Sequence, residues 1–483
     1  MLSNVRVAKS ARFAGILGLF AAIVPSGAQA AMTYVVTGTW DSDTRRNAAI
    51  ASMNTAVAAY NDYGQFDKSL TVTYNGDPNV VRTADGNYNG SIRFGGTFPN
   101  VRVTQHEIAH TLGIGTTSNY SDRMTGGTWD GARGNAIVRQ FDGEGAGLLG
   151  DSAHFWPYGL NFDGEASAIN NVRQVAVMYA MRGDMGLGPT AHPSAAKTVA
   201  LTATDALGES GFNYHTKWND GYFAHAGAAY STGNFAVRTP ASAASFRFYG
   251  DSLTINNKTD SNGGFYYKGG GTTGVVTVND LILDGGWIHH LSGPTDLFQL
   301  AGKITVVSGS TLRAKQGNIN ILASVTGSGN LAIATTDDPD THARYVRFLS
   351  STNTFTGSIN VDGRFELADN ANLKFVIGAN GVNNAIAGAS ADGVLLNGDF
   401  EIMLPASATA GNAWRLVTAA NTVYGSTFTV EGFTELTAGL WRSGEYAFSE
   451  ATGTLSVVPE PVSIAVFGFA GLALARRRRN RGA

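Results

Sequence analysis

The 483-residue chain contains no cysteine. A disulfide framework is therefore excluded, and so is any metal site built on thiolates. A metal ion in this protein would have to be held by histidine and carboxylate side chains. The chain has nine histidines, so the set of candidate imidazole ligands is small.

Charged residues are also scarce, at 15% of the chain, whereas there are 61 glycines. This composition is more typical of extracellular β structure than of a cytosolic enzyme. The formal charge of the whole chain is −3, but eight of its 34 basic residues lie in segments 1–30 and 462–483, which hold no acid. Residues 31–461 therefore carry 26 basic and 37 acidic side chains, a charge of −11, which argues against a nucleic-acid partner.

Both ends of the chain read as targeting signals. Residues 1–30 combine three basic residues, an apolar run and the small-residue site Ala28-Gln29-Ala30, which predicts a secretory signal peptide. Residues 458–483 hold Pro459-Glu460-Pro461, an apolar run and an arginine cluster, in that order. This order resembles the PEP-CTERM sorting signal of Gram-negative bacteria. The resemblance implies an exosortase partner, transient membrane anchoring and a final place at the cell surface or in the matrix; a plain membrane anchor is the alternative.

The strongest candidate for a functional site is the sequence HEIAH at residues 106–110. His106 and His110 are four residues apart, so a helix places both imidazoles on one face, with Glu107 beside the first. Two neutral imidazoles in this arrangement bind Zn²⁺, and the carboxylate acts as base toward water. Asn100 or Thr104 is expected to cap the start of this helix, and Gly113 to end it.

The longer run HEIAHTLG resembles the active-site helix of metzincin zinc metallopeptidases. Their pattern is H-E-x-x-H-x-x-G-x-x-H, and here His106, Glu107, His110 and Gly113 match it, whereas the last position is Thr116. The resemblance covers the segment from about Leu70 to Gly188. It implies a zincin-like fold, Zn²⁺ as cofactor, Glu107 as catalytic residue and a peptide or protein substrate.

Threonine is a poor zinc ligand, so a third donor must come from elsewhere in the chain. His154 lies in the same predicted domain, in the aromatic stretch DSAHFWPYGLN at residues 151–161, which makes it the favoured third ligand. Three carboxylates are rivals, because a carboxylate can complete a two-histidine site; they belong to Asp122, Asp163 and Glu165. His192 lies just past the end of the domain, and the pair His289-His290 lacks a third partner.

Val175–Met185 contains Met178 and Tyr179, which loosely resemble the methionine turn beneath the zinc in metzincins. A helix from Ile169 to Met181 with Met178 in the core is the favoured interpretation of the same residues.

The sequence predicts a multidomain protein, with an α+β domain at 31–190 that is α/β in its upper half, and an all-β region at 191–457. In the first domain, strands are expected at Thr33–Thr37, Leu70–Tyr74 and Ser91–Phe94, the last as the edge strand that pairs with substrate, and a helix at Thr44–Tyr60. After a linker at 188–193, short strands alternate with turns, and 325–333 echoes 355–361. These segments resemble autotransporter-associated β-strand repeats, which implies a parallel β-helix (solenoid); a pair of β-sandwiches is the alternative.

The leading functional hypothesis is a secreted, surface-retained zinc metallopeptidase, with metal ligands His106, His110 and His154 and with Glu107 as base. The first alternative, kept open by Thr116, is a structural surface protein or adhesin with a degenerate peptidase-like domain. Zinc-dependent hydrolysis of a non-peptide amide is the second. In each case, residues 191–457 are assigned as a spacer or display scaffold.

Overall fold

The computed structural model describes residues 31–256, 264–335, 344–389 and 392–458. The signal peptide and the sorting signal expected at the two ends lie outside these residues, apart from Val458. These described residues are mostly β structure with five α-helices, which all lie before residue 185. Within the described residues, no helix combines the length and the apolar character needed to cross a membrane.

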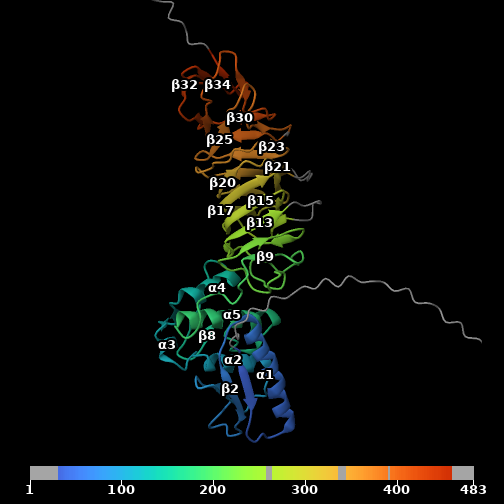
Figure 1. The fold of residues 1–483 in the computed structure, drawn as a ribbon, viewed down its shortest axis with the longest axis vertical. Helices are drawn as coiled ribbons and strands as arrows, with labels where there is room; N and C mark the ends of the chain where they lie inside the picture. Colours follow the sequence, from blue (N-terminus) through green and yellow to red (C-terminus); the bar gives the residue numbers. More distant parts are fainter. Residues whose placement is uncertain (1–30, 257–263, 336–343, 390–391, 459–483) are drawn as a thin grey trace, which may run out of the picture.

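The N-terminal region contains a four-stranded sheet covered by long helices (Figure 1). The sheet order is β1-β2-β4-β3, with the first three strands parallel and β3 antiparallel. A small antiparallel sheet, β5 to β8, follows helix α2. The elements are β1 (Thr33–Val36), α1 (Asp43–Tyr63), β2 (Ser69–Tyr74), β3 (Ala84–Gly86), β4 (Ser91–Phe94), α2 (Val101–Thr111), α3 (Ser118–Ser121), β5 (Met124–Thr125), β6 (Thr128–Trp129), α4 (Ala132–Asp142), β7 (Leu149–Gly150), β8 (Phe155–Trp156) and α5 (Ala168–Asp184).

One sequence-based assignment in this sheet is wrong. Ser91–Phe94 was expected at the edge, but β4 pairs with β2 on one side and with β3 on the other. The edge strand is β3, a three-residue segment that carries Asp85 and Gly86. The sequence does not predict β3, because the segment has no alternating apolar residues. The strand forms through its pairing with β4 across the turn at 87–90.

The C-terminal region is a stack of large parallel sheets, an arrangement compatible with a solenoid (Figure 1). Parallel pairing argues against the pair of β-sandwiches, which would be antiparallel. One twelve-stranded sheet comprises β9 (Thr198–Ala200), β10 (Ala229–Ser231), β12 (Phe246–Phe248), β13 (Ser252–Asn256), β15 (Val275–Asp284), β17 (Leu297–Ser308), β19 (Asn318–Ile321), β20 (Ser324–Gly327), β22 (Tyr345–Phe348), β24 (Arg364–Leu367), β27 (Val394–Leu396) and β30 (Thr422–Tyr424).

Two further parallel sheets and an antiparallel sheet complete the stack. The seven-stranded sheet comprises β11 (Ala236–Arg238), β14 (Gly264–Tyr267), β16 (Trp287–His290), β18 (Ser310–Ala314), β21 (Leu331–Thr335), β23 (Ile359–Val361) and β26 (Ile386–Ala387). The three-stranded sheet comprises β25 (Asn372–Val376), β28 (Asp399–Met403) and β31 (Thr429–Val430). The antiparallel sheet comprises β29 (Ala413–Arg415), β32 (Thr434–Thr437), β33 (Leu440–Ser443), β34 (Tyr446–Ser449) and β35 (Thr454–Val457).

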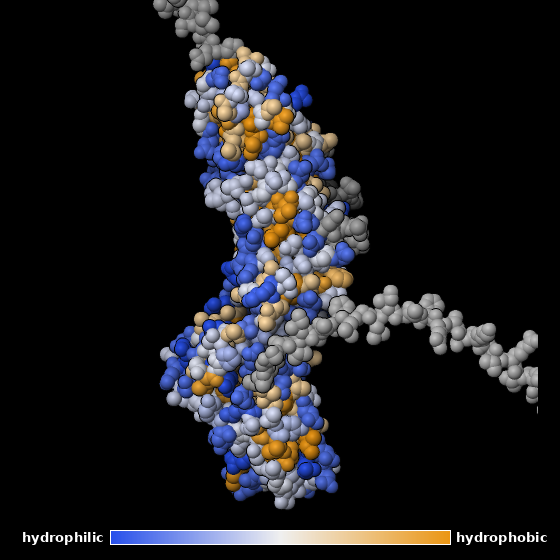
Figure 2. Space-filling model, in the orientation of Figure 1, coloured by the Kyte–Doolittle hydropathy of each residue, from blue (hydrophilic) through white to orange (hydrophobic). Residues whose placement is uncertain are grey.

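Each region has its own hydrophobic core. One cluster of buried residues runs from Met32 to Met185 and includes Phe223, and the other runs from Val199 to Val457. On the face seen in Figure 2, hydrophobic residues form separate patches between hydrophilic ones along the length of the molecule. Buried residues alternate with partly buried ones along strands such as β13 and β15, so each strand turns one set of side chains inward.

The segment expected to be a linker packs against the helices. The Tyr179 hydroxyl donates to the Ala191 carbonyl at 2.9 Å, and an Arg133 guanidinium nitrogen donates to the Thr190 carbonyl at 2.8 Å. Beyond it, the Gln140 side chain of α4 donates to the Ala224 carbonyl at 2.8 Å. The α+β region and the first β strands are therefore joined by direct contacts.

A glycine in the stack provides a test of its packing. Gly302 in β17 has φ +102°, and a Cβ atom there would lie 1.8 Å from the Val278 carbonyl oxygen of the neighbouring strand. Gly302→Ala should therefore lower the free energy of unfolding by about 3 kcal/mol, since backbone atoms cannot give way cheaply. Gly309→Ala is the matched control, because no atom lies within 4 Å of its added methyl group. Equal urea midpoints for the two variants would contradict the strand registration described above.

Candidate metal centre

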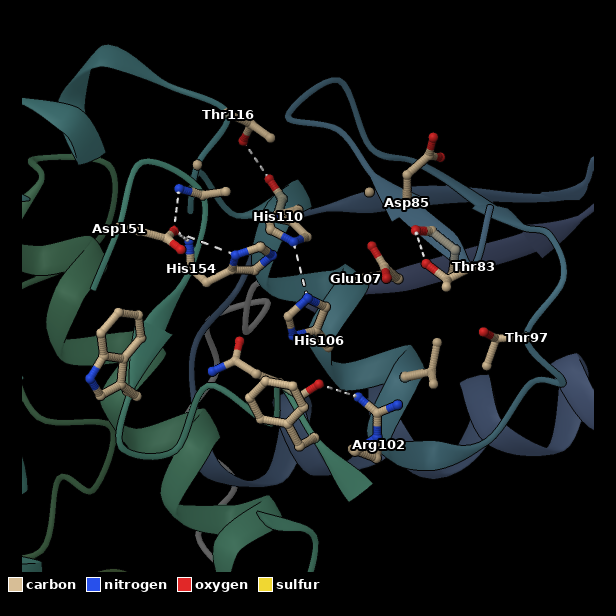
Figure 3. A pocket seen from close by; sticks show the side chains of 18 residues that line it. Thr83, Asp85, Thr97, Arg102, His106, Glu107, His110, Thr116, Asp151 and His154 are labelled. Atoms are coloured by element: carbon tan, nitrogen blue, oxygen red, sulfur yellow. Dashed lines mark hydrogen bonds and ion pairs between the residues drawn. The ribbon is translucent and has the colours of Figure 1, made fainter. Parts of the chain in front are cut away.

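Helix α2 presents the HEIAH residues to a cleft. Asn100 caps the helix, with its side-chain oxygen accepting the Val103 N–H at 3.0 Å, and Gly113 follows the helix end with φ +117°. Both features agree with the sequence prediction. Thr104 and Ile108 are buried on the opposite face of the helix, which fixes the direction in which His106 and His110 point (Figure 3).

The backbone fixes the orientation of both imidazoles. His106 Nδ1 lies 3.0 Å from the Gly159 carbonyl oxygen, and His110 Nδ1 lies 2.8 Å from the Ile114 carbonyl oxygen. A carbonyl only accepts, so each Nδ1 carries the proton and each Nε2 keeps a lone pair. Burial, reinforced by the charge of the neighbouring His110, lowers the pKa of His106 to about 4, and burial lowers the pKa of His110. Both rings are therefore neutral at neutral pH, the form that binds metals.

The two lone pairs face each other. His106 Nε2 and His110 Nε2 are 3.3 Å apart. Two acceptor nitrogens at this distance repel each other unless a cation lies between them. Nitrogens bound to one tetrahedral zinc ion at about 2.05 Å each would themselves be about 3.3 Å apart. The spacing of the pair therefore suits such an ion.

His154 is brought to the same point from a distant loop. The three histidines offer ligand nitrogens that all lie within 4.8 Å of one another, and their rings converge in Figure 3. The Asp151 carboxylate shapes the loop, accepting the Ala153 and His154 N–H groups at 2.8 and 2.7 Å. The buried Tyr120 hydroxyl donates to the Asp151 and His154 carbonyls at 3.1 and 2.6 Å.

A second loop holds the carbonyl that orients His106. Tyr158 and Leu160 both have left-handed backbone conformations, with φ 70° and 55°, on either side of Gly159. Such conformations are costly for residues with a Cβ and persist only where the surroundings fix them. Arg102 does so here: its guanidinium donates to the Leu160 and Asn161 carbonyls at 2.9 and 3.2 Å. Arg102 lies one helical turn before His106, which is the sequence signal that could have identified it.

Thr116 and the three rival carboxylates do not join the cluster. The Thr116 hydroxyl donates to the His110 carbonyl at 2.6 Å. Asp163 forms an ion pair with Arg102 at 2.6 Å, and the Glu165 carboxylate accepts the Asn161 N–H at 2.8 Å. Asp122 is exposed at the end of α3. Among the described residues, His106, His110 and His154 are the one group close enough to hold a metal ion together.

Three other sequence candidates lie elsewhere. Met178 is fully buried inside α5, so the methionine-turn interpretation is wrong and the core-helix interpretation is confirmed. A helix forms there because no residue in the segment breaks the apolar period. His192 stacks on His225, with ring centroids 3.8 Å apart. His289 and His290 are buried in β16.

Glu107 faces the cleft beside the histidines (Figure 3). Burial, with the nearby Asp85 charge, raises the pKa of Glu107 to about 8, although Arg102 and the Gly86 N–H oppose the shift. The Gly86 backbone lies so close to helix α2 that a Cβ atom added to Gly86 would be 2.2 Å from the Glu107 carbonyl oxygen. Asp85 is itself bound to Arg93, at 2.9 Å between Nε and Oδ1. Sequence reasoning missed Asp85, because the edge strand that carries it was not recognised.

These residues line a cleft of about 570 Å³. Its walls include β3, α2 and the loops around His154 and Phe162. Comparison of the chain with family models, curated proteins and solved structures finds no match. The functional argument therefore depends on the arrangement of the site's own residues.

The Tyr120 hydroxyl provides a test of how the His154 loop is held. Tyr120→Phe should lower the free energy of unfolding by about 1–2 kcal/mol, because two carbonyls lose a donor. Hydrogen exchange at the Ala153 and His154 amides should also become faster. Tyr179→Phe is the control, since its hydroxyl bonds to the Ala191 carbonyl far along the chain. Unchanged exchange at both amides in Tyr120→Phe would show that the loop is held by other contacts.

Proposed function

We propose that this protein is a zinc-dependent metallopeptidase that hydrolyses peptide bonds. The observation that carries the proposal is the pair of Nε2 lone pairs of His106 and His110, 3.3 Å apart, with a third imidazole from His154 beside them. Three protein ligands with an open fourth position are typical of catalytic zinc, whereas structural sites are closed by four.

In this proposal, His106, His110 and His154 hold the zinc ion. When bound, zinc supplies Lewis acidity, which lowers the pKa of water and polarises a carbonyl group. Glu107 takes a proton from the attacking water and passes it to the leaving amine. Burial raises the pKa of this carboxyl group, which favours the protonated form that must donate to the leaving amine.

The edge strand β3 supports a peptide as substrate. Gly95 N–H donates to the Thr83 carbonyl and Asn87 N–H to the Ser91 carbonyl, so Thr83 and Asn87 face β4. In an antiparallel pair the residues between them, Ala84 and Gly86, direct their backbone groups away from the sheet. Both line the cleft. An extended substrate can therefore pair with β3 as an added strand, close to Glu107.

We further propose a zincin-like fold for residues 31–190 and a parallel β-helix for residues 191–457, similar to autotransporter-associated repeats. The stacked parallel sheets support the second assignment. The expected signal peptide and PEP-CTERM-like signal support secretion, processing by an exosortase and retention at the cell surface. In this arrangement, the β region carries the catalytic domain away from the membrane.

The identity of the third ligand provides a test of the zinc site. His154→Ala should lower zinc affinity by more than about 100-fold, since even the loss of an outer-shell contact costs 10- to 100-fold. Thr116→Ala is the matched control and should keep about one zinc per chain, because its hydroxyl bonds to a carbonyl. Metal content after dialysis is the measurement.

Two outcomes would contradict this zinc site. If His154→Ala keeps its zinc while Asp163→Ala or Glu165→Ala loses it, the third ligand is a carboxylate. If the wild-type protein retains no zinc, a structural surface protein with a degenerate domain becomes the better explanation.

The role of Glu107 has its own test. Glu107→Gln preserves the shape of the side chain but removes the base, so turnover should fall by about 100-fold or more. Zinc content should stay unchanged, since Glu107 is not a ligand in this proposal. Peptide hydrolysis by this variant at the wild-type rate would exclude Glu107 as the base.

A further inference from the structure

A second cavity, of about 370 Å³, lies where the helices meet the first β strands. Phe141 and Asp142 at the end of α4 and Arg173 of α5 form one side. The other side comes from the β region, including Asn213, Arg238 and Lys268. The cavity therefore exists only when the two regions are packed together.

Cationic side chains outnumber carboxylates in the lining of this cavity, which holds Arg173, Arg238 and Lys268 against Asp142 and Glu209. No ion pair involves the three cations among the residues that the structure describes. The two acids form their closest contacts with other residues. Asp142 accepts the Tyr158 hydroxyl at 2.6 Å, and Glu209 pairs with Lys217 at 3.4 Å.

The Lys268 ammonium donates to the Leu291 carbonyl at 2.6 Å, but two guanidinium nitrogens of the lining lack acceptors. The Nε atoms of Arg173 and Arg238 are buried without a partner. The hydroxyl oxygens of Thr239 and Ser242 accept the Lys268 and Ala244 N–H groups, so each hydroxyl still has its proton to donate. Unpaired buried donors cost free energy, which a ligand rich in oxygen acceptors would recover.

One acceptor is unpaired as well. Asn213 is 8% exposed, and its amide nitrogen donates to the Phe141 carbonyl at 3.1 Å, while its Oδ1 atom has no partner. A ligand that carries a hydroxyl group beside its anionic group offers the donor that this acceptor lacks. The Tyr214 ring in the same lining adds an aromatic surface, over which the Arg173 guanidinium lies at 5.2 Å.

We propose that this cavity binds an acidic sugar: a carboxylate on a hydroxylated ring of monosaccharide size. The carboxylate meets Arg238, Lys268 and Arg173, and a ring hydroxyl donates to Asn213. The volume corresponds to roughly twelve water molecules at ~30 Å³ each, more than a bare inorganic oxyanion occupies. Binding here requires neither zinc nor hydrolysis, so it is independent of the peptidase proposal.

The test uses the full chain and D-glucuronate as the probe, in calorimetric titrations at constant ionic strength. D-Glucose, which has a hydroxymethyl group in place of the carboxylate, is the matched neutral ligand. Glucuronate should bind saturably and glucose should not. Arg238→Gln and Lys268→Gln should each weaken glucuronate binding by about tenfold or more, since each removes a charged hydrogen bond. Lys303→Gln removes a lysine that pairs with Asp280 outside the cavity, and it should leave the affinity unchanged.

Three results would overturn the proposal. The first is no glucuronate binding to the wild-type chain. The second is a loss of glucuronate affinity in Lys303→Gln as large as that in Arg238→Gln and Lys268→Gln, which would indicate a non-specific effect of charge. The third is inorganic sulfate binding as tightly as glucuronate, which would reduce the site to one for a bare oxyanion. Thermal unfolding of each variant identifies any variant that does not fold. If only Lys268→Gln folds, its glucuronate affinity can still be compared with that of the wild-type chain.

Discussion

The candidate site depends on one interaction, the approach of two imidazole nitrogens to 3.3 Å without a proton to share. The backbone enforces it, because the Gly159 and Ile114 carbonyls each hold an Nδ1–H and leave both Nε2 lone pairs pointing to the same place. A helix supplies the spacing, but only these carbonyls turn the rings toward each other. Other contacts in the domain keep these carbonyls and His154 in position.

Rigidity around the cluster comes from a few buried polar contacts. Arg102 bonds to the Leu160 and Asn161 carbonyls just after Gly159, and Tyr120 bonds to the two carbonyls that bracket the His154 turn. A metal site assembled in this way loses little conformational entropy when an ion binds, because its ligands are already ordered. The left-handed residues Tyr158 and Leu160 lie next to the carbonyl that orients His106.

The β region also contributes to this order. Arg173 of α5 donates to the Tyr158 hydroxyl at 3.3 Å and to the Asn213 carbonyl at 3.2 Å, which links the strained loop to the first part of the β stack. Gln140 reaches the Ala224 carbonyl across the same boundary. The stack is therefore more than a spacer attached through a flexible segment, and the cavity at the boundary is formed by both regions.

The sequence alone determined the helix of the HEIAH motif, the core position of Met178 and the β character of the C-terminal region, because local periodicity dictates these features. It narrowed the cap of the helix to Asn100 or Thr104, and the structure identifies Asn100. Short-range pattern could only favour His154 over Asp163 and Glu165. The tertiary structure decided between them, since it places His154 beside the helix and gives the two carboxylates other partners. It also created the edge strand β3 and the roles of Arg102 and Tyr120. These features depend on contacts between residues distant in sequence, which no local pattern encodes.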